Sequence, residues 1–196
     1  MIFNIGRVRV DLSPLFFIFC ALLILVDKTG MMSASIIASL IHEFSHIFSM
    51  NLVKCPPRNI KIRAYGMEIV GGICNSFSSN SIITLSGPFS NIVLSMISFM
   101  LYQKYATYFL LSFTVINASI AALNLLPIKG LDGGDFFESL IIKKMGYKKG
   151  RCIFELVSVL TAILTLGGGV FFLIIEGNPT LILLSVYLIL LNIFKF

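Results

Sequence analysis

Long apolar segments are the feature that most constrains what this chain can fold into. Of its 196 residues, 57% are hydrophobic and 12% are charged, whereas about 25% of the residues in a soluble domain are charged. A helix needs roughly 20 apolar residues to cross the hydrocarbon core of a bilayer, and it satisfies its own backbone groups there. We therefore predict an all-α polytopic membrane protein with about six transmembrane helices, at residues 12–26, 31–53, 81–101, 106–126, 152–175 and 179–194.

The same composition excludes a soluble enzyme, a nucleic-acid-binding module and a disordered tail. The cysteines argue against a disulfide-stapled secreted domain, because they are widely spaced and form no C-x-x-C pair. They are Cys20, Cys55, Cys74 and Cys152. We expect residues 1–196 to form a single integral-membrane domain.

The basic residues predict how the chain is oriented. Six crossings would place thirteen of the 15 Lys and Arg residues on the same side as both termini, and only Lys28 and Lys104 on the other. Basic loops stay in the cytoplasm, so we expect a multi-pass protein of the cell membrane with both termini cytoplasmic. The basic excess is then a topological signal and a contact for anionic lipids of the bilayer, and we expect no nucleic-acid partner.

Two short segments on the predicted cytoplasmic side have the pattern of strands. Residues 7–12 alternate polar and apolar side chains, and so do residues 60–63, from which the chain continues to 69–70. A period of two marks a half-buried strand. The two segments could pair in a small membrane-associated β element, or they are polar connectors.

The second predicted helix contains His42-Glu43-Phe44-Ser45-His46, which reads H-E-x-x-H and holds both histidines of the chain. Residues at i and i+4 share a helix face, so both imidazoles can reach one ion, with Glu43 beside them. A carboxylate near the bilayer centre costs about 2.5–3.5 kcal/mol on insertion scales. A bound cation would compensate that cost. The alternatives are a polar patch that bonds to neighbouring helices, or a proton relay in a transporter.

A catalytic zinc site usually has three protein ligands, so two histidines leave one ligand to be found. Asp132 is a candidate, because it follows the fourth predicted helix in a segment where Pro127, Gly130, Gly133 and Gly134 interrupt the helix. It reaches the level of the histidines only if the chain after Pro127 folds back or stays embedded. Otherwise this segment is an ordinary surface turn.

Two motifs in order carry a family resemblance. H-E-x-x-H, followed after a later helix by N-x-x-P-x-x-x-L-D-G-G from Asn124 to Gly134, resembles the site-2 protease family of intramembrane zinc metalloproteases. The match spans residues 31–134, which we take as the core. The segment from Ser86 to Asn91 is similar to the family's A-G-P-x-x-N pattern and would open the third helix. Ser45 stands where the family usually has glycine.

The compact sequence looks most like the stage IV sporulation protease branch, which processes a membrane-associated sigma-factor precursor. It has no PDZ-like insertion, and we expect no regulatory C-terminal domain. The resemblance thus implies regulated intramembrane proteolysis in sporulation, with membrane-protein inhibitors or regulators as further partners.

The resemblance also implies the site. His42, His46 and Asp132 would bind one Zn²⁺ per chain, and Glu43 would be the catalytic base that activates water for hydrolysis of a peptide bond. The substrate would be a membrane-associated protein, cleaved in or near its membrane segment.

Further residues would handle the substrate. Asn124 would bind the substrate backbone or the oxyanion, or else pack between helices, and Asn91 is a second substrate-binding candidate. An exposed strand near residues 60–70 could capture the substrate by β-addition.

Two other functions fit the polar helix. A catalytically silent membrane regulator or ion-handling protein could use it, although such a protein would not need Glu43. A prenyl-protein peptidase would also carry a membrane metal site, but it would not account for the segment from Asn124 to Gly134.

Overall fold

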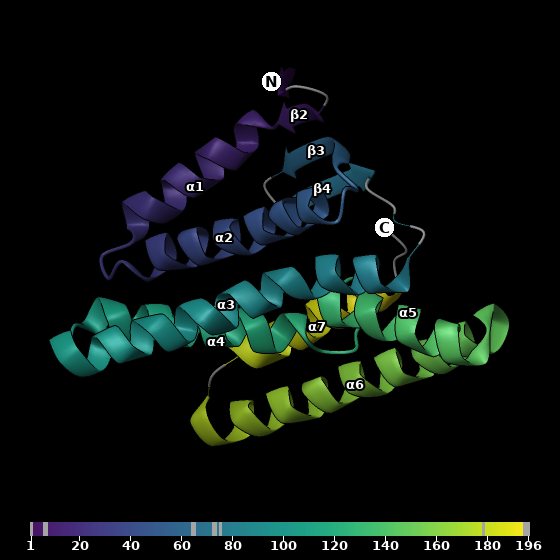
Figure 1. Ribbon diagram of the computed structural model, residues 1–196. Coiled ribbons are helices and arrows are strands. Elements are labelled where there is room, and N and C mark those ends of the chain that lie inside the picture. Colours follow the sequence, from purple (N-terminus) through teal and green to yellow (C-terminus); the bar gives the residue numbers. More distant parts are fainter. Residues whose placement is uncertain are drawn as a thin grey trace. The chain divides into compact units, whose positions relative to one another are not determined.

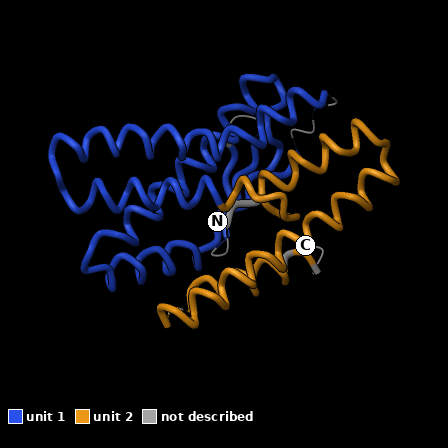
Figure 2. Tube along the Cα trace, turned by 90° about the horizontal axis from the view of Figure 1, so that it is seen from below, with its two compact units in different colours: residues 1–122 blue, residues 123–196 orange. Residues whose placement is uncertain are grey.

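The computed structural model describes residues 2–5, 8–63, 66–71, 74, 76–177 and 179–193. Residue 7 of the segment 7–12, residues 64 and 65 of the expected strand near 60–70, and residue 194 of the last predicted span lie outside this described part. The chain divides into two compact units, Met1–Ala122 and Leu123–Phe196, coloured separately in Figure 2. Each unit is described by itself.

Helices dominate the structure, as the apolar segments predict (Figure 1). Three of them are long and apolar enough to cross a membrane: α2 (Met31–Leu52), α3 (Phe77–Tyr105) and α6 (Tyr147–Glu176). The other apolar helices are shorter, namely α1 (Pro14–Val26), α4 (Tyr108–Asn124) and α7 (Thr180–Ile193). Every predicted span therefore falls on a helix, but the structure does not confirm a count of six crossings.

In the first unit, short polar signals separate α1 from α2. Pro14 stands in the first turn of α1, where a missing backbone N–H costs nothing. Asp27 follows α1 and accepts hydrogen bonds from the backbone and hydroxyl of Ser33, in the first turn of α2. The Ser33 backbone bond, at a helix end that favours negative charge, lowers the pKa of Asp27 to about 2.

The small sheet confirms that the two alternating segments pair. β2 (Val8–Leu12) runs parallel to β3 (Pro57–Arg63), with Val10 opposite Ile60, and both of these side chains are buried. Two antiparallel strands complete the order β1-β2-β3-β4; the sequence did not predict the first of them, and the last lies within the strand region expected near residues 60–70. They are β1 (Ile2–Ile5) and β4 (Gly66–Gly71).

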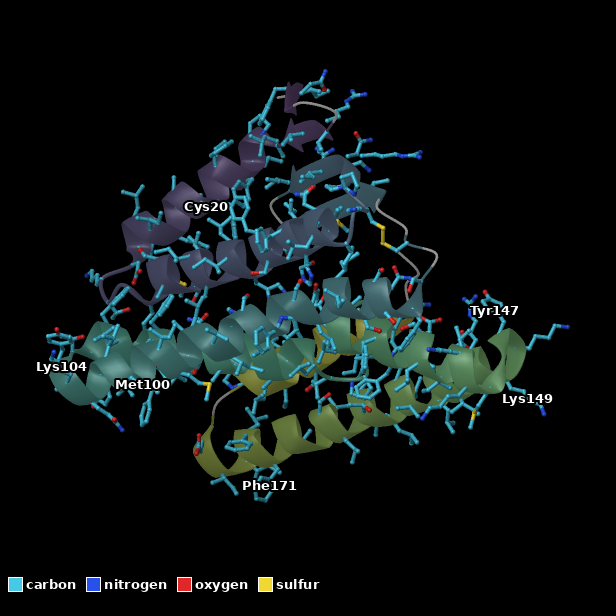
Figure 3. All side chains as sticks on the ribbon, in the orientation of Figure 1. Cys20, Met100, Lys104, Tyr147, Lys149 and Phe171 are labelled. Carbon is cyan, nitrogen blue, oxygen red and sulfur yellow. A yellow bond between two sulfur atoms is a disulfide. The ribbon has the colours of Figure 1, made fainter. Side chains whose placement is uncertain are left out.

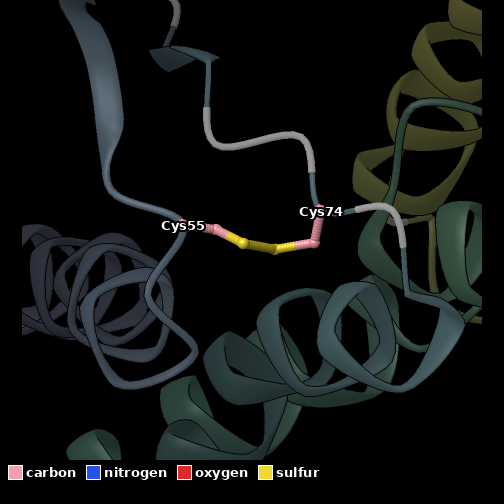
Figure 4. Close-up of a disulfide and its surroundings, with 2 residues drawn as sticks. All are labelled: Cys55 and Cys74. Carbon is pink, nitrogen blue, oxygen red and sulfur yellow. A yellow bond between two sulfur atoms is a disulfide. The ribbon is translucent and has the colours of Figure 1, made fainter.

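A disulfide closes the base of the β3–β4 hairpin (Figure 4). It joins Cys55, just after α2, to Cys74, just before α3. The bond sits beside a buried cluster that includes Met50 and Ile83 from the same two helices. The disulfide therefore links the two ends of the hairpin next to the end of α2 and the start of α3.

The second unit contains a helix that the span prediction missed, α5 (Asp132–Met145), together with α6 and α7. Acidic residues stand in its first turn and Lys143 and Lys144 in its last, which suits the helix dipole. Ile128, in the connection before α5, is fully buried against Ala162 of α6 and Leu188 of α7. The chain after Pro127 is thus packed into this unit.

Large apolar side chains cover the outside of α6, as expected of a helix that faces lipid. Figure 3 shows Tyr147 and Lys149 near one end of this helix and Phe171 toward the other, and Phe171 is 60% exposed. The buried side of the helix is built largely from small residues, including Ser158 and Ala162. Small residues let neighbouring membrane helices approach closely.

Candidate metal centre

The two histidines of H-E-x-x-H lie side by side on α2. His42 and His46 are 6% and 7% exposed, and their Nε2 atoms are 3.3 Å apart. The spacing of four residues on one helix puts both rings on one face, and this face of α2 packs against α3.

The other ring nitrogens both meet oxygen acceptors. His46 Nδ1 lies 2.8 Å from the backbone carbonyl of Ile83, and His42 Nδ1 lies 2.8 Å from Oδ1 of Asn91. A carbonyl oxygen can only accept, so each Nδ1 carries the hydrogen. Metal-ligating histidines commonly donate their second ring N–H to a carbonyl in this way.

This arrangement brings the two Nε2 atoms close together. A neutral imidazole has one donor and one acceptor nitrogen, so with Nδ1 donating, both Nε2 atoms are acceptors. Two acceptor atoms 3.3 Å apart are close enough to bind the same cation. The donor set suits zinc, which binds imidazole nitrogen and carboxylate oxygen.

Gly87 allows α3 to approach the two rings. A Cβ atom at this position would lie 2.7 Å from His42 Nε2 and closer still to His46 Nε2. Pro88 follows inside α3, which begins at Phe77. The pattern predicted that the segment from Ser86 to Asn91 would open the third helix, and this prediction is wrong. The segment lies in the interior of that helix, and there it forms the wall next to the histidines.

Glu43 lies beside the two histidines and lines a pocket in the first unit. The pocket has a volume of about 280 Å³ and lies between α1, α2 and the end of β3. Its walls are mainly apolar, and Cys20 and Arg63 also line it. Glu43 is half-buried and is the acidic residue among those that line this pocket.

Asp132 is the first residue of α5 in the second unit and is half-buried. The connection before it turns at Gly130, whose φ of +88° suits glycine. A Cβ at Gly133 or Gly134 would overlap backbone atoms of Leu125 or Ile128. The D-G-G sequence thus lets this connection pack directly on the start of α5, so it is not an ordinary surface turn.

His42 and His46 of the first unit offer two imidazole nitrogens and Asp132 of the second unit offers one carboxylate oxygen, and these three residues could hold one metal ion. Zinc sites of the catalytic kind have three protein ligands of these types.

The two predicted substrate-binding asparagines differ in their surroundings. Asn91 has no exposed surface and contacts His42, whereas Asn124 is half-buried at the end of α4. The sequence reasoning missed Asn117 on α4, which is also fully buried and bonds to Asn91. Its only sequence signal is an amide inside an apolar helix.

The fold and the paired histidines define a helical membrane protein with a candidate metal site, and known proteins agree with this class. Residues 101–165, a third of the chain, match the model of peptidase family M50. That segment contains Asn124 and Asp132. None of the curated proteins matches the sequence.

The structure is similar to that of the site-2 protease from Methanocaldococcus jannaschii. The TM-score is 0.66 at 19% sequence identity, over 98% of this chain and 93% of that chain. At 19% sequence identity, this similarity is evidence for the fold alone.

Proposed function

We propose that the protein is an intramembrane zinc metalloprotease that hydrolyses a peptide bond in or near the membrane segment of a membrane-associated protein. The observation that carries the proposal is the pair of buried Nε2 atoms, 3.3 Å apart, with Glu43 beside them. The M50 match and the site-2 protease fold support the same class.

In this proposal each residue of the site has one role. His42, His46 and Asp132 would hold one Zn²⁺, which would supply Lewis acidity toward water and the scissile carbonyl. Glu43 takes a proton from the attacking water and passes it to the leaving amine. Asn124 donates a hydrogen bond to the substrate backbone or to the developing oxyanion.

The pocket beside Glu43 indicates what the substrate offers near the cleaved bond. Its apolar walls, which include Phe16, Leu23 and Leu40, fit a large apolar side chain next to an unwound stretch of backbone. β4 is an edge strand of the sheet, so it is available for β-addition of an extended peptide. β3 is paired with a strand on both sides, so it is not available for β-addition. The resemblance to the sporulation branch suggests a sigma-factor precursor as the substrate.

Cleavage by the Glu43→Gln variant tests the function. We expect this variant to keep zinc and to lose cleavage, because it removes the base and no ligand, whereas Asp132→Ala should lose zinc as well. The assay is co-expression with candidate single-span proteins and a membrane-associated sigma-factor precursor, together with metal analysis of purified protein. Wild-type cleavage by Glu43→Gln would contradict the mechanism. Zinc binding without cleavage of any candidate, in both proteins, would favour a silent regulator.

Cys20 gives a direct test of the pocket. Because its thiol lines the pocket, a bulky maleimide on Cys20 should reduce cleavage at least tenfold while zinc stays bound. The test uses a Cys152→Ser background, since Cys152 is the other free cysteine and is exposed. Cys20→Ser treated in the same way is the control and should keep full activity. Unchanged cleavage by fully labelled protein would show that the substrate does not use this pocket.

A further inference from the structure

Three buried side chains form a chain of hydrogen bonds from α4 to the metal centre. Asn117 Nδ2 donates to the backbone carbonyl of Phe113 at 2.8 Å. Asn91 Nδ2 donates to Asn117 Oδ1 at 3.0 Å, and Asn91 Oδ1 lies 2.8 Å from His42 Nδ1. Both amides have no exposed surface, so their bonding is decided within the protein.

The direction of this chain is fixed at its far end. The Phe113 carbonyl can only accept, so the amide nitrogen of Asn117 must face it and Oδ1 must face Asn91. Asn91 must then present Nδ2 to Asn117 and Oδ1 to His42. The Ala38 carbonyl, 3.5 Å from Asn91 Nδ2, favours the same orientation. Reversing either amide would bring two acceptors or two donors together in a buried site, which costs free energy.

We propose that Asn117 and Asn91 are positioning residues that set the tautomer of His42. Through them, the Phe113 carbonyl keeps the hydrogen of His42 on Nδ1, so that Nε2 is the nitrogen that would bind the metal ion. This inference rests on the metal-binding role proposed above, and it gives Asn91 a different role from direct contact with the substrate.

The second histidine provides an internal comparison. His46 donates from Nδ1 to the Ile83 carbonyl, a backbone group that needs no side chain to orient it. A substitution of Asn117 should therefore change the tautomer of His42 and leave the tautomer of His46 unchanged. The chain has only 2 histidines, so nitrogen NMR of histidine-labelled protein resolves both rings.

The decisive variant is Asn117→Leu, which keeps the approximate size and removes both amide groups. In metal-free protein at alkaline pH, we expect His42 to gain the Nε2–H tautomer. Zinc affinity, measured by competition with a chromophoric chelator, should fall roughly 10–100-fold, as is usual when a partner of a metal ligand is lost.

Two further variants separate positioning from packing. Asn117→Asp keeps an acceptor opposite Asn91 Nδ2, so it should preserve the His42 tautomer and most of the zinc affinity. Thr114→Val is the matched control, because Thr114 lies on the same helix and its hydroxyl meets Ser98 of α3 at 2.8 Å, away from the histidines. It should leave both rings and the zinc affinity unchanged.

The outcomes distinguish this inference from the function on which it rests. If wild-type protein binds zinc and Asn117→Leu leaves the His42 tautomer and the zinc affinity unchanged, the positioning role of Asn117 and Asn91 is wrong, whereas the proposed metal site is not contradicted. An equal tautomer change in both histidines would also contradict the positioning role, since it would indicate general disruption of the structure. If wild-type protein binds no zinc, both proposals fail.

Discussion

At the scale of single residues, close contact between backbone and imidazole shapes the metal centre. Gly87 lets α3 pass against both rings, and Ile83, one turn earlier on the same helix, accepts the Nδ1 hydrogen of His46. The histidines and Glu43 could be predicted from H-E-x-x-H, because that motif needs only the geometry of one helix. Asn117 and the role of Gly87 could not, because they depend on which helices pack against α2.

Gly87→Ala should disable the site without unfolding the protein. The added methyl would occupy space next to both Nε2 atoms, so we expect loss of zinc binding and of proteolysis, with helix content by circular dichroism unchanged. Gly167→Ala is a suitable control, since no atom of the described residues outside that stretch of helix lies within 4 Å of a Cβ at this helical glycine. Normal zinc content in Gly87→Ala would mean that the ion is held elsewhere.

At the scale of elements, the β3–β4 hairpin and α5 show where the sequence patterns sufficed and where they did not. Alternation revealed β2 and β3, because each has a side facing the interior, as Val10 and Ile60 show. β1 and β4 are edge strands, so their pairing depends on partners that are distant in sequence. α5 was missed because the glycines at its start read as a turn. The acidic first turn and the basic last turn of α5 are a signal that would have predicted it.

Removing the disulfide should loosen the hairpin and spare the metal centre. In the double variant Cys55→Ser, Cys74→Ser, we expect faster hydrogen exchange over residues 57–71. The disulfide closes a loop with a sequence separation of 19, and the variant lacks this cross-link. Zinc affinity should stay within about twofold, since the partners of both histidines lie within helices. Cys152→Ser controls for the loss of a thiol. A large loss of zinc would show that the hairpin holds the ends of α2 and α3 in place.

At the scale of the whole molecule, two general rules disagree about the compartment of the sheet. Basic residues flank the disulfide, including Lys54 and Arg58, and basic loops stay in the cytoplasm. Disulfides, however, persist mainly in oxidising compartments. The apolar segments predicted a membrane protein because lipid requires them, but neither rule alone fixes the orientation.

Thiol trapping in intact cells tests the orientation. Following the basic residues, we expect Cys55 and Cys74 to be reduced in the cell and to form the disulfide only on isolation in air. Cells are treated with a membrane-permeant alkylating reagent before lysis, and the alkyl groups per chain are counted by mass spectrometry. Protection of Cys55 and Cys74 at that stage, with Cys20 and Cys152 labelled, would instead place the hairpin in an oxidising compartment.

The hydrogen bonds around the histidines also bear on how the protein matures. α2 carries both imidazoles, but their partners are Ile83 and Asn91 of α3, and Asn91 depends in turn on α4. The hydrogen-bonded surroundings of the two histidines can therefore form only after the chain has been synthesised as far as Asn117.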